Sequence, residues 1–102
     1  MSTSKKIKME DSDSLNKELV TLVIEKTLIN AGRETYDKVI EKLKNEHHCD
    51  LSDCYRNPNY LSQVLKDVYA TDANIIVESI KKELGKFKRE KNIAKFLDAI
   101  CQ

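Results

Sequence analysis

Glycine and proline are scarce in this sequence, and their scarcity bears on the fold class. The 102-residue chain has two glycines and one proline. An all-β chain needs turn residues about every 8–12 positions, so these counts favour helix. Charged residues make up 34% of the chain, against about 25% in an average domain, and both signs occur almost equally, leaving a net charge of +1. We therefore expect an all-α domain built from amphipathic helices.

The sequence also lacks long apolar runs, so we expect neither a membrane span nor a secretory signal. No stretch approaches the roughly 18 consecutive apolar residues that a membrane span requires. Residues 1–14 contain lysines but no apolar segment or small-residue cleavage site, so we expect no secretory signal there. The three cysteines, an odd number, fit free thiols in a reducing compartment. These features predict a cytoplasmic protein without membrane contact.

The sequence offers few of the parts that catalysis needs. Its glycines, Gly32 and Gly85, are isolated, so neither a dinucleotide-binding loop nor a phosphate-binding loop is present. A small helical bundle also leaves little concave surface for a substrate. We therefore expect no enzyme activity, no cofactor and no small-molecule substrate.

Apolar spacing divides the chain into a tail and one helical domain. Residues 1–13 are polar apart from three side chains and have no face to bury, so we expect a disordered tail. Residues 14–102 are expected to form a compact bundle of about five helices. The first helix should begin with Asp13 or Ser14 as N-cap and end at Gly32, in the left-handed conformation that glycine adopts readily.

The remaining helices follow from the same i, i+3, i+4 periodicity. We expect helices over residues 33–46, 58–69 and 73–84, and a last helical segment within 86–102. Residues 47–57 form a loop pinned by Leu51 and Tyr55, and Asn57 with Pro58 is a typical helix start. Whether residues 86–92 are helix or linker stays open.

The first predicted helix is apolar over much of its circumference. One stripe contains Leu15, Leu19, Leu22, Val23, Lys26 and Ile29. A second stripe is formed by Val20, Ile24 and Leu28. A helix with so wide an apolar surface either lies at the centre of the core or also contacts a partner. We therefore predict Val20, Ile24 and Leu28 as a partner surface.

Residues that could bind a metal cluster in the predicted loop. The cluster contains His47, His48, Cys49, Asp50, Asp53 and Cys54. Their spacing differs from that of structural zinc sites, because Cys49 and Cys54 lie five residues apart and no second ligand pair follows. We predict a helix end followed by a loop, with no metal, although metal binding by His47, His48, Cys49 and Cys54 stays open.

Positive charge concentrates near the end of the sequence. Residues 81–102 carry a net charge of +4 and residues 1–80 a net charge of −3. A solvated helix face explains such a stretch; phosphate contact with a nucleic acid and an acidic protein partner are the alternatives. The candidate contact residues are Lys81, Lys82, Lys86, Lys88, Arg89, Lys91 and Lys95.

The middle of the chain resembles a known family. The residues that carry the resemblance are the segments 51–53 (Leu-Ser-Asp), 57–61 (Asn-Pro-Asn-Tyr-Leu), 64–65 (Val-Leu), 68–73 (Val-Tyr-Ala-Thr-Asp-Ala) and 76–84. This pattern is similar to the thaumarchaeal Nitrosopumilus-type output domains and covers about residues 15–85. It departs from them at Ala70-Thr71-Asp72, where a glycine is expected. The resemblance implies a helical module in archaeal signalling or regulation, with no catalytic residues.

Two functional hypotheses follow. The first is a non-enzymatic interaction or output module in signal transduction or regulation, which acts by protein–protein contact with a partner or as a homodimer. The second is a nucleic-acid-associated regulator that uses the basic stretch 81–95 on phosphates. The nearly neutral net charge and the single arginine in that stretch favour the first.

Overall fold

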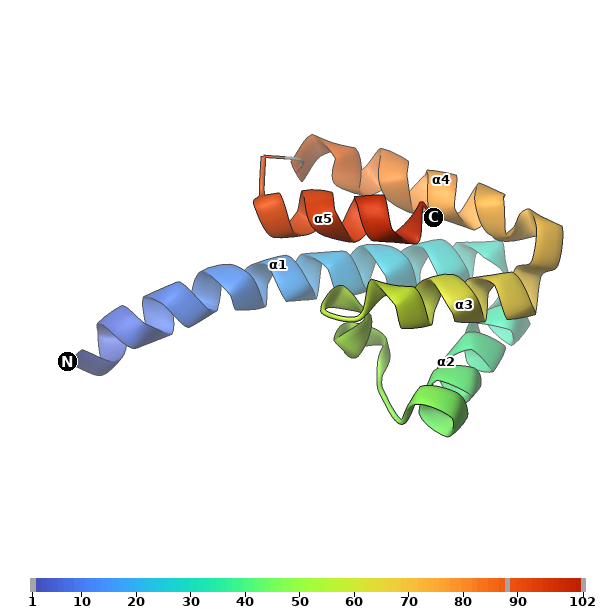
Figure 1. Cartoon of the computed structure of the whole chain (residues 1–102), viewed down its shortest axis with the longest axis horizontal. Coiled ribbons are helices and arrows are strands. Elements are labelled where there is room, and N and C mark those ends of the chain that lie inside the picture. Colours follow the sequence, from blue (N-terminus) through green and yellow to red (C-terminus); the bar gives the residue numbers. More distant parts are fainter. Residues whose placement is uncertain (1, 88, 102) are drawn as a thin grey trace.

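Helices make up almost all of the regular structure, which we describe from a computed structural model. The structure describes residues 2–87 and 89–101, and the side chains of 14–87 and 89–101. Over these residues there are five α-helices and three short 3₁₀ segments (Figure 1). In chain order they are α1 (Ser2–Ala31), α2 (Arg33–His47), η1 (Leu51–Tyr55), α3 (Pro58–Tyr69), η2 (Ala70–Asp72), α4 (Ala73–Leu84), η3 (Gly85–Phe87) and α5 (Lys91–Ile100). The predicted all-α class is confirmed.

The long helix α1 runs through the middle of the molecule. In Figure 1, α4 and α5 lie along one side of it, and α2, η1 and α3 lie along the other side. α1 contacts η1, α2, α4 and α5, while α3 closes the bundle by packing against α2, α4 and α5. The pair α4 and α5 and the pair α2 and η1 therefore both pack against α1.

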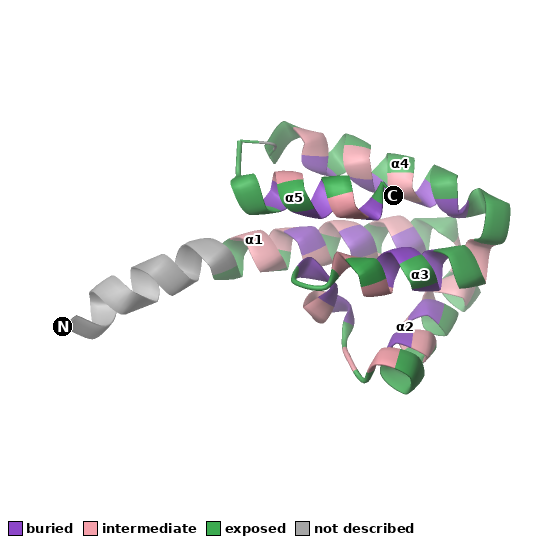
Figure 2. Ribbon diagram, viewed as in Figure 1, coloured by how far each residue is buried: buried purple, intermediate pink, exposed green. Residues whose placement is uncertain are grey.

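The core lies where these elements meet along α1. Val20, Ile24 and Leu28 of α1 are completely buried there, and the inward sides of the surrounding helices are buried with them (Figure 2). The other fully enclosed large side chains are Val39, Leu43, Leu61, Val64, Leu65, Ile80, Leu84, Ile93 and Phe96. No helix among the described residues combines the length and apolar character that crossing a bilayer demands.

Gly32 forms the corner between α1 and α2. Its N–H donates to the carbonyl oxygens of Leu28 and Ile29, both at 3.1 Å, and its own carbonyl oxygen accepts from the Thr35 hydroxyl at 2.9 Å. The prediction that glycine ends the first helix is confirmed, but the predicted left-handed conformation is wrong. With φ 147° and ψ 128°, Gly32 instead lies in an extended positive-φ region, where a side chain is strained.

The segment between α2 and α3 is more ordered than the predicted loop. It contains η1, whose start is closed by a capping box in which the side chains of Asp50 and Asp53 each accept from the other's backbone N–H. Leu51 and Tyr55 are buried, as predicted. η1 packs against α1 and α3, and this contact pins the connection to the core.

The starts of three helices show how their capping differs from the predictions. α3 begins at Pro58 as predicted, but the Asn57 side chain makes no capping bond and donates to the Asp53 carbonyl oxygen at 3.2 Å. The bounds of α1 are Ser2–Ala31, and the predicted cap at Asp13 or Ser14 lies at the edge of residues 1–13, whose side chains are not described. α5 begins at Lys91 after η3, which makes most of the stretch 86–92 a connection.

Residues 1–13, predicted to be a tail, fall outside the residues whose side chains the structure describes.

Substituting the two glycines should have opposite effects on stability. At Gly32 an added Cβ would be strained by the positive φ and would lie 3.2 Å from Thr35 Oγ1. Gly32→Ala should therefore lower the free energy of unfolding by about 1–3 kcal/mol. Gly85 has helical φ −57° and ψ −31° and no atom within 4 Å of an added Cβ. Gly85→Ala should raise it by about 0.4–1 kcal/mol.

Urea denaturation followed by circular dichroism measures both differences. Equal effects of the two substitutions would contradict the assignment of Gly32 as the strained corner.

Candidate interaction surface

Helix α1 has two apolar faces on opposite sides. Successive residues of an α-helix are rotated by about 100°, so Leu15, nine residues before Ile24, points about 180° away from it. Ile24 is 0% exposed, whereas Leu15 is 62%, Leu22 63% and Ile29 39% exposed. We call the side formed by Leu15, Leu22 and Ile29 the outer face of α1.

This arrangement overturns the role that the sequence predicted for one stripe. Val20, Ile24 and Leu28, predicted as a partner surface, are 0% exposed and form the centre of the core, so that prediction is wrong. Of the other stripe, Leu19 and Val23 are half-buried against the core, while the outer face remains in solvent. The physical reason is that η1, α2 and α4 close over the side of α1 that carries Val20, Ile24 and Leu28.

Charged side chains border the outer face. Glu18 and Lys26 are exposed, and Glu25 is half-buried. Glu25 Oε2 accepts a hydrogen bond from the Tyr36 hydroxyl of α2 at 3.2 Å. Burial raises the pKa of Tyr36, and this hydrogen bond and the charge of Glu25 raise it further. The Glu25 carboxylate is thus held in place at the edge of the outer face.

An exposed isoleucine on α4 adjoins this surface. Ile75 is 63% exposed, and it lines a groove of about 360 Å³ between α4 and the part of α1 that includes Lys26 and Asn30. Ile75 was not among the residues predicted to contact a partner, although it is apolar and lies off the buried stripe of α4. The outer face therefore continues from α1 towards α4.

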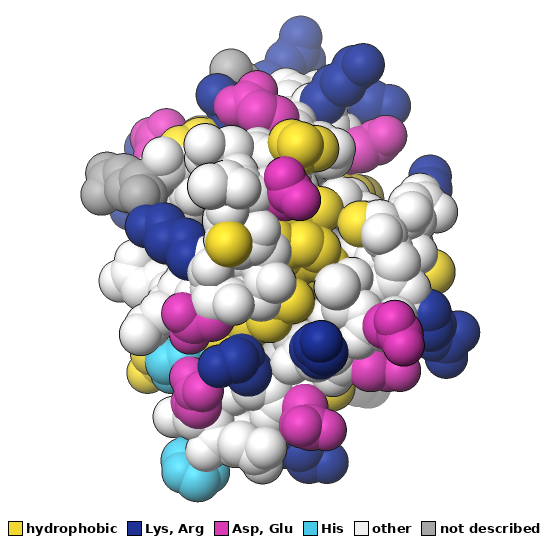
Figure 3. Space-filling view, turned by 90° about the vertical axis from the view of Figure 1, so that its right-hand side faces the viewer, with side chains coloured by type: hydrophobic (Ala, Val, Ile, Leu, Met, Phe, Trp, Pro, Cys, Tyr) yellow, Lys and Arg dark blue, Asp and Glu magenta, His cyan; other side chains and the backbone are white. Residues whose placement is uncertain are grey.

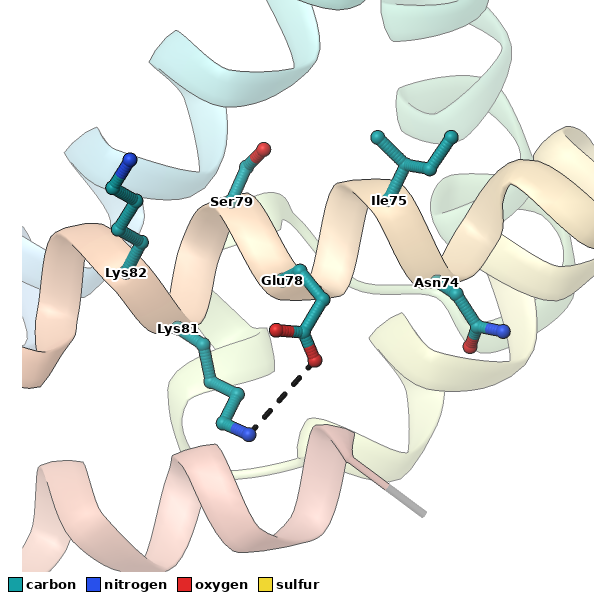
Figure 4. A pocket seen from close by; sticks show the side chains of 6 residues that line it. All are labelled: Asn74, Ile75, Glu78, Ser79, Lys81 and Lys82. Atoms are coloured by element: carbon teal, nitrogen blue, oxygen red, sulfur yellow. Dashed lines mark ion pairs between the residues drawn. The ribbon is translucent and has the colours of Figure 1, made fainter.

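Figure 4 shows a second hollow, on the outside of α4. It has a volume of about 560 Å³ and is lined by residues of α4 alone. Ile75, Ser79 and Lys82 point to one side of the helix, and Glu78 and Lys81 point towards the side where α5 lies, with Lys81 Nζ 3.9 Å from Glu78 Oε2. A hollow formed by one helix cannot enclose a ligand, so it does not resemble a substrate pocket.

The end of the bundle at the right of Figure 1 carries apolar, acidic and basic side chains. In Figure 3 apolar side chains are visible in a crease down the middle of this face, and acidic and basic side chains alternate along its edges. Lys and Arg side chains gather at the top of the view, with Asp and Glu side chains between them.

The predicted basic contact residues are distributed over several surfaces. Lys82, Lys86, Arg89, Lys91 and Lys95 are exposed and Lys81 is half-buried; Lys88 lies outside the described residues. Lys82 borders the groove with α1, whereas Lys95 borders a hollow with Tyr55 and Pro58 on another side. Glu90 lies within the stretch and accepts from Asn16 Nδ2 at 3.1 Å. Lys82 and Lys95 therefore lie on different faces of the bundle.

The histidine and cysteine cluster is built into the packing around η1. The His47 ring stacks on Tyr60 with centroids 4.3 Å apart, and His48 ends α2 with φ 52°. Cys54 is fully buried, and burial raises the pKa of its thiol to about 12. Burial also raises the pKa of Cys49. Among the described residues, no group of three or more His, Cys, Asp and Glu side chains is placed to hold a metal ion.

Comparisons with protein families, curated proteins and solved structures found no match.

The two faces of α1 should respond differently to truncation. Ile24→Ala leaves a cavity in the core and should lower the free energy of unfolding by about 2–5 kcal/mol. Leu22→Ala, two positions earlier on the same helix, should change it by less than about 0.5 kcal/mol at low protein concentration. Urea denaturation of the two variants measures the difference, and similar losses would contradict the burial of only one face.

The thiols should differ sharply in reactivity. The thiolate is the reactive form, and at pH 8 the buried Cys54, with a pKa of about 12, is almost entirely protonated. Cys101 is exposed. Iodoacetamide should therefore modify Cys101 first in the native protein and Cys54 only after unfolding in urea, as peptide mass spectrometry would show. Rapid native modification of Cys54 would contradict its placement in the core.

Proposed function

We propose that this protein is a non-enzymatic helical interaction module that acts by protein–protein contact through the outer face of α1. The observation that carries the proposal is the exposure of Leu15, Leu22 and Ile29 on the same helix that forms the centre of the core. Full burial of a leucine side chain contributes about 1.5–3 kcal/mol, so a partner that covers this face gains a substantial driving force.

The setting of the proposal is signal transduction or regulation in the cytoplasm. The resemblance of residues 15–85 to archaeal output domains supports a role in signalling or regulation. The cytoplasmic location is supported by the free thiols of Cys49, Cys54 and Cys101, which suit a reducing compartment. In this proposal the bundle keeps α1 rigid, and the outer face carries the recognition.

Nucleic-acid binding has less support. Phosphate binding gains from several cations that reach one backbone together. The described lysines of the 81–95 stretch border different hollows, and Lys81 lies 3.9 Å from the Glu78 carboxylate. The Lys and Arg side chains that gather at one end of the bundle have Asp and Glu side chains between them, which weakens the attraction of a phosphate backbone (Figure 3).

Site-specific photo-crosslinking tests the proposed contact surface. A benzophenone maleimide is attached to Leu22→Cys in a Cys49→Ser/Cys101→Ser background, and the labelled chain is irradiated in an extract of the cells that produce it. We expect discrete adducts, because Leu22 is 63% exposed at the centre of the outer face. Mass spectrometry then identifies the attached protein.

Two controls make the result specific. The same label at Gln63→Cys, on the exposed side of α3, should not form these adducts. An excess of unlabelled wild-type chain should suppress them, whereas an excess of Leu22→Glu chain should not. Absence of adducts at position 22, or the same adducts at position 63, would overturn the proposal.

A further inference from the structure

The outer stripe of α1 has the spacing of a coiled-coil seam. Leu15, Leu19, Leu22, Lys26 and Ile29 follow one another at intervals of four, three, four and three residues. This is the alternation of the a and d positions of a heptad repeat, in which Leu19 and Lys26 occupy a while Leu15, Leu22 and Ile29 occupy d. The d positions Leu15, Leu22 and Ile29 lie on the side of α1 opposite the core, and Leu19 at an a position is half-buried against the core. A second helix can therefore cover the exposed d positions without displacing the bundle.

The charges beside the seam discriminate between parallel and antiparallel pairing. Glu18 and Glu25 occupy the g positions and lie along one edge of the seam, and Lys26 lies towards the other edge. In an antiparallel pair of identical helices each edge meets its own copy, which places Glu18 beside Glu25 of the second copy. In a parallel pair the two different edges meet, which places Lys26 beside Glu25 of the second copy. The parallel arrangement brings Lys26 and Glu25 together and separates the glutamates of the two copies, while it places the two Lys26 side chains in one layer.

We propose that the outer face of α1 binds a second copy of this chain in a parallel, in-register, two-stranded coiled coil. The proposal rests on the proposed function and names its partner. Leu15, Leu22 and Ile29 of each copy pack against the same residues of the other and lose their contact with water.

Lys26 tunes the strength and direction of this pairing. In register, the two Lys26 side chains occupy the same layer, which weakens the seam relative to an apolar residue there. Each ammonium group also reaches the Glu25 carboxylate of the second copy, which the Tyr36 hydroxyl holds at 3.2 Å. A polar residue at a single a position disfavours shifted registers, because a shift places the lysine opposite an apolar side chain. Ile75, next to Lys26 in the groove between α1 and α4, adds apolar surface beside the seam.

Sedimentation equilibrium of the full chain under reducing conditions tests the pairing. We expect a reversible monomer–dimer equilibrium. Leu22→Glu places a charge in a central layer and should weaken dimerisation at least tenfold. Lys26→Leu replaces the self-opposed lysine by an apolar residue and should strengthen dimerisation at least tenfold. Gln63→Glu adds the same charge as Leu22→Glu, but on the exposed side of α3. It should change the dimer dissociation constant less than twofold.

Disulfide trapping tests the orientation. In a Cys49→Ser/Cys101→Ser background, Leu15→Cys chains should form a disulfide-linked dimer on mild oxidation, because residues of the same layer lie side by side in a parallel pair. Ile29→Cys chains should do the same. An antiparallel pair centred on Leu22 would instead link Leu15→Cys to Ile29→Cys in a mixture of the two variants.

The outcomes separate this inference from the proposed function. A chain that stays monomeric throughout, a dimer that Leu22→Glu leaves intact, or exclusive cross-linking of position 15 to position 29 would overturn the parallel coiled coil. If position 22 meanwhile forms specific adducts with a different protein, the interaction module stands and its partner is that protein. If position 22 forms no specific adducts and the chain is monomeric, both proposals are wrong.

Discussion

The burial of one stripe of α1 is the constraint on which the rest of the structure depends. Val20, Ile24 and Leu28 are completely buried on the helix that η1, α2, α4 and α5 contact. A 102-residue chain can build only a modest core, and here the buried residues of α1 lie between Val20 and Leu28 (Figure 2). The two halves share this helix and also meet directly, where α3 packs against α4 and α5.

Helix positions were the part of the fold that could be predicted from the sequence. The second to fourth helices each have a single apolar stripe, and their predicted bounds agree closely with α2, α3 and α4. Pro58 and Gly85 mark boundaries because of local backbone chemistry, which acts over a few residues and is visible in sequence. Leu51 and Tyr55 could be placed in the core because they are the large apolar residues of an otherwise polar loop.

The candidate surface could not be assigned correctly because α1 carries two apolar stripes. Either stripe could have faced the core, and the choice depends on which side η1, α2 and α4 cover, a non-local property. Gly32 shows the same limit on a smaller scale. A glycine after an apolar stripe predicts a helix end, but its φ of 147° is set by the direction in which α2 must leave to pack against α1. The spread of the basic residues over several surfaces also depends on the turn between α4 and α5.

The opposition of the two faces of α1 has an evolutionary consequence. Substitutions on the outer face do not touch the side chains that hold the bundle together, because Leu22 points into solvent while Ile24 lies in the core. Selection for binding therefore acts on the exposed residues of α1, and selection for folding acts on its buried residues, although both sets lie on one helix. A change in what the outer face recognises therefore leaves the architecture of the bundle intact.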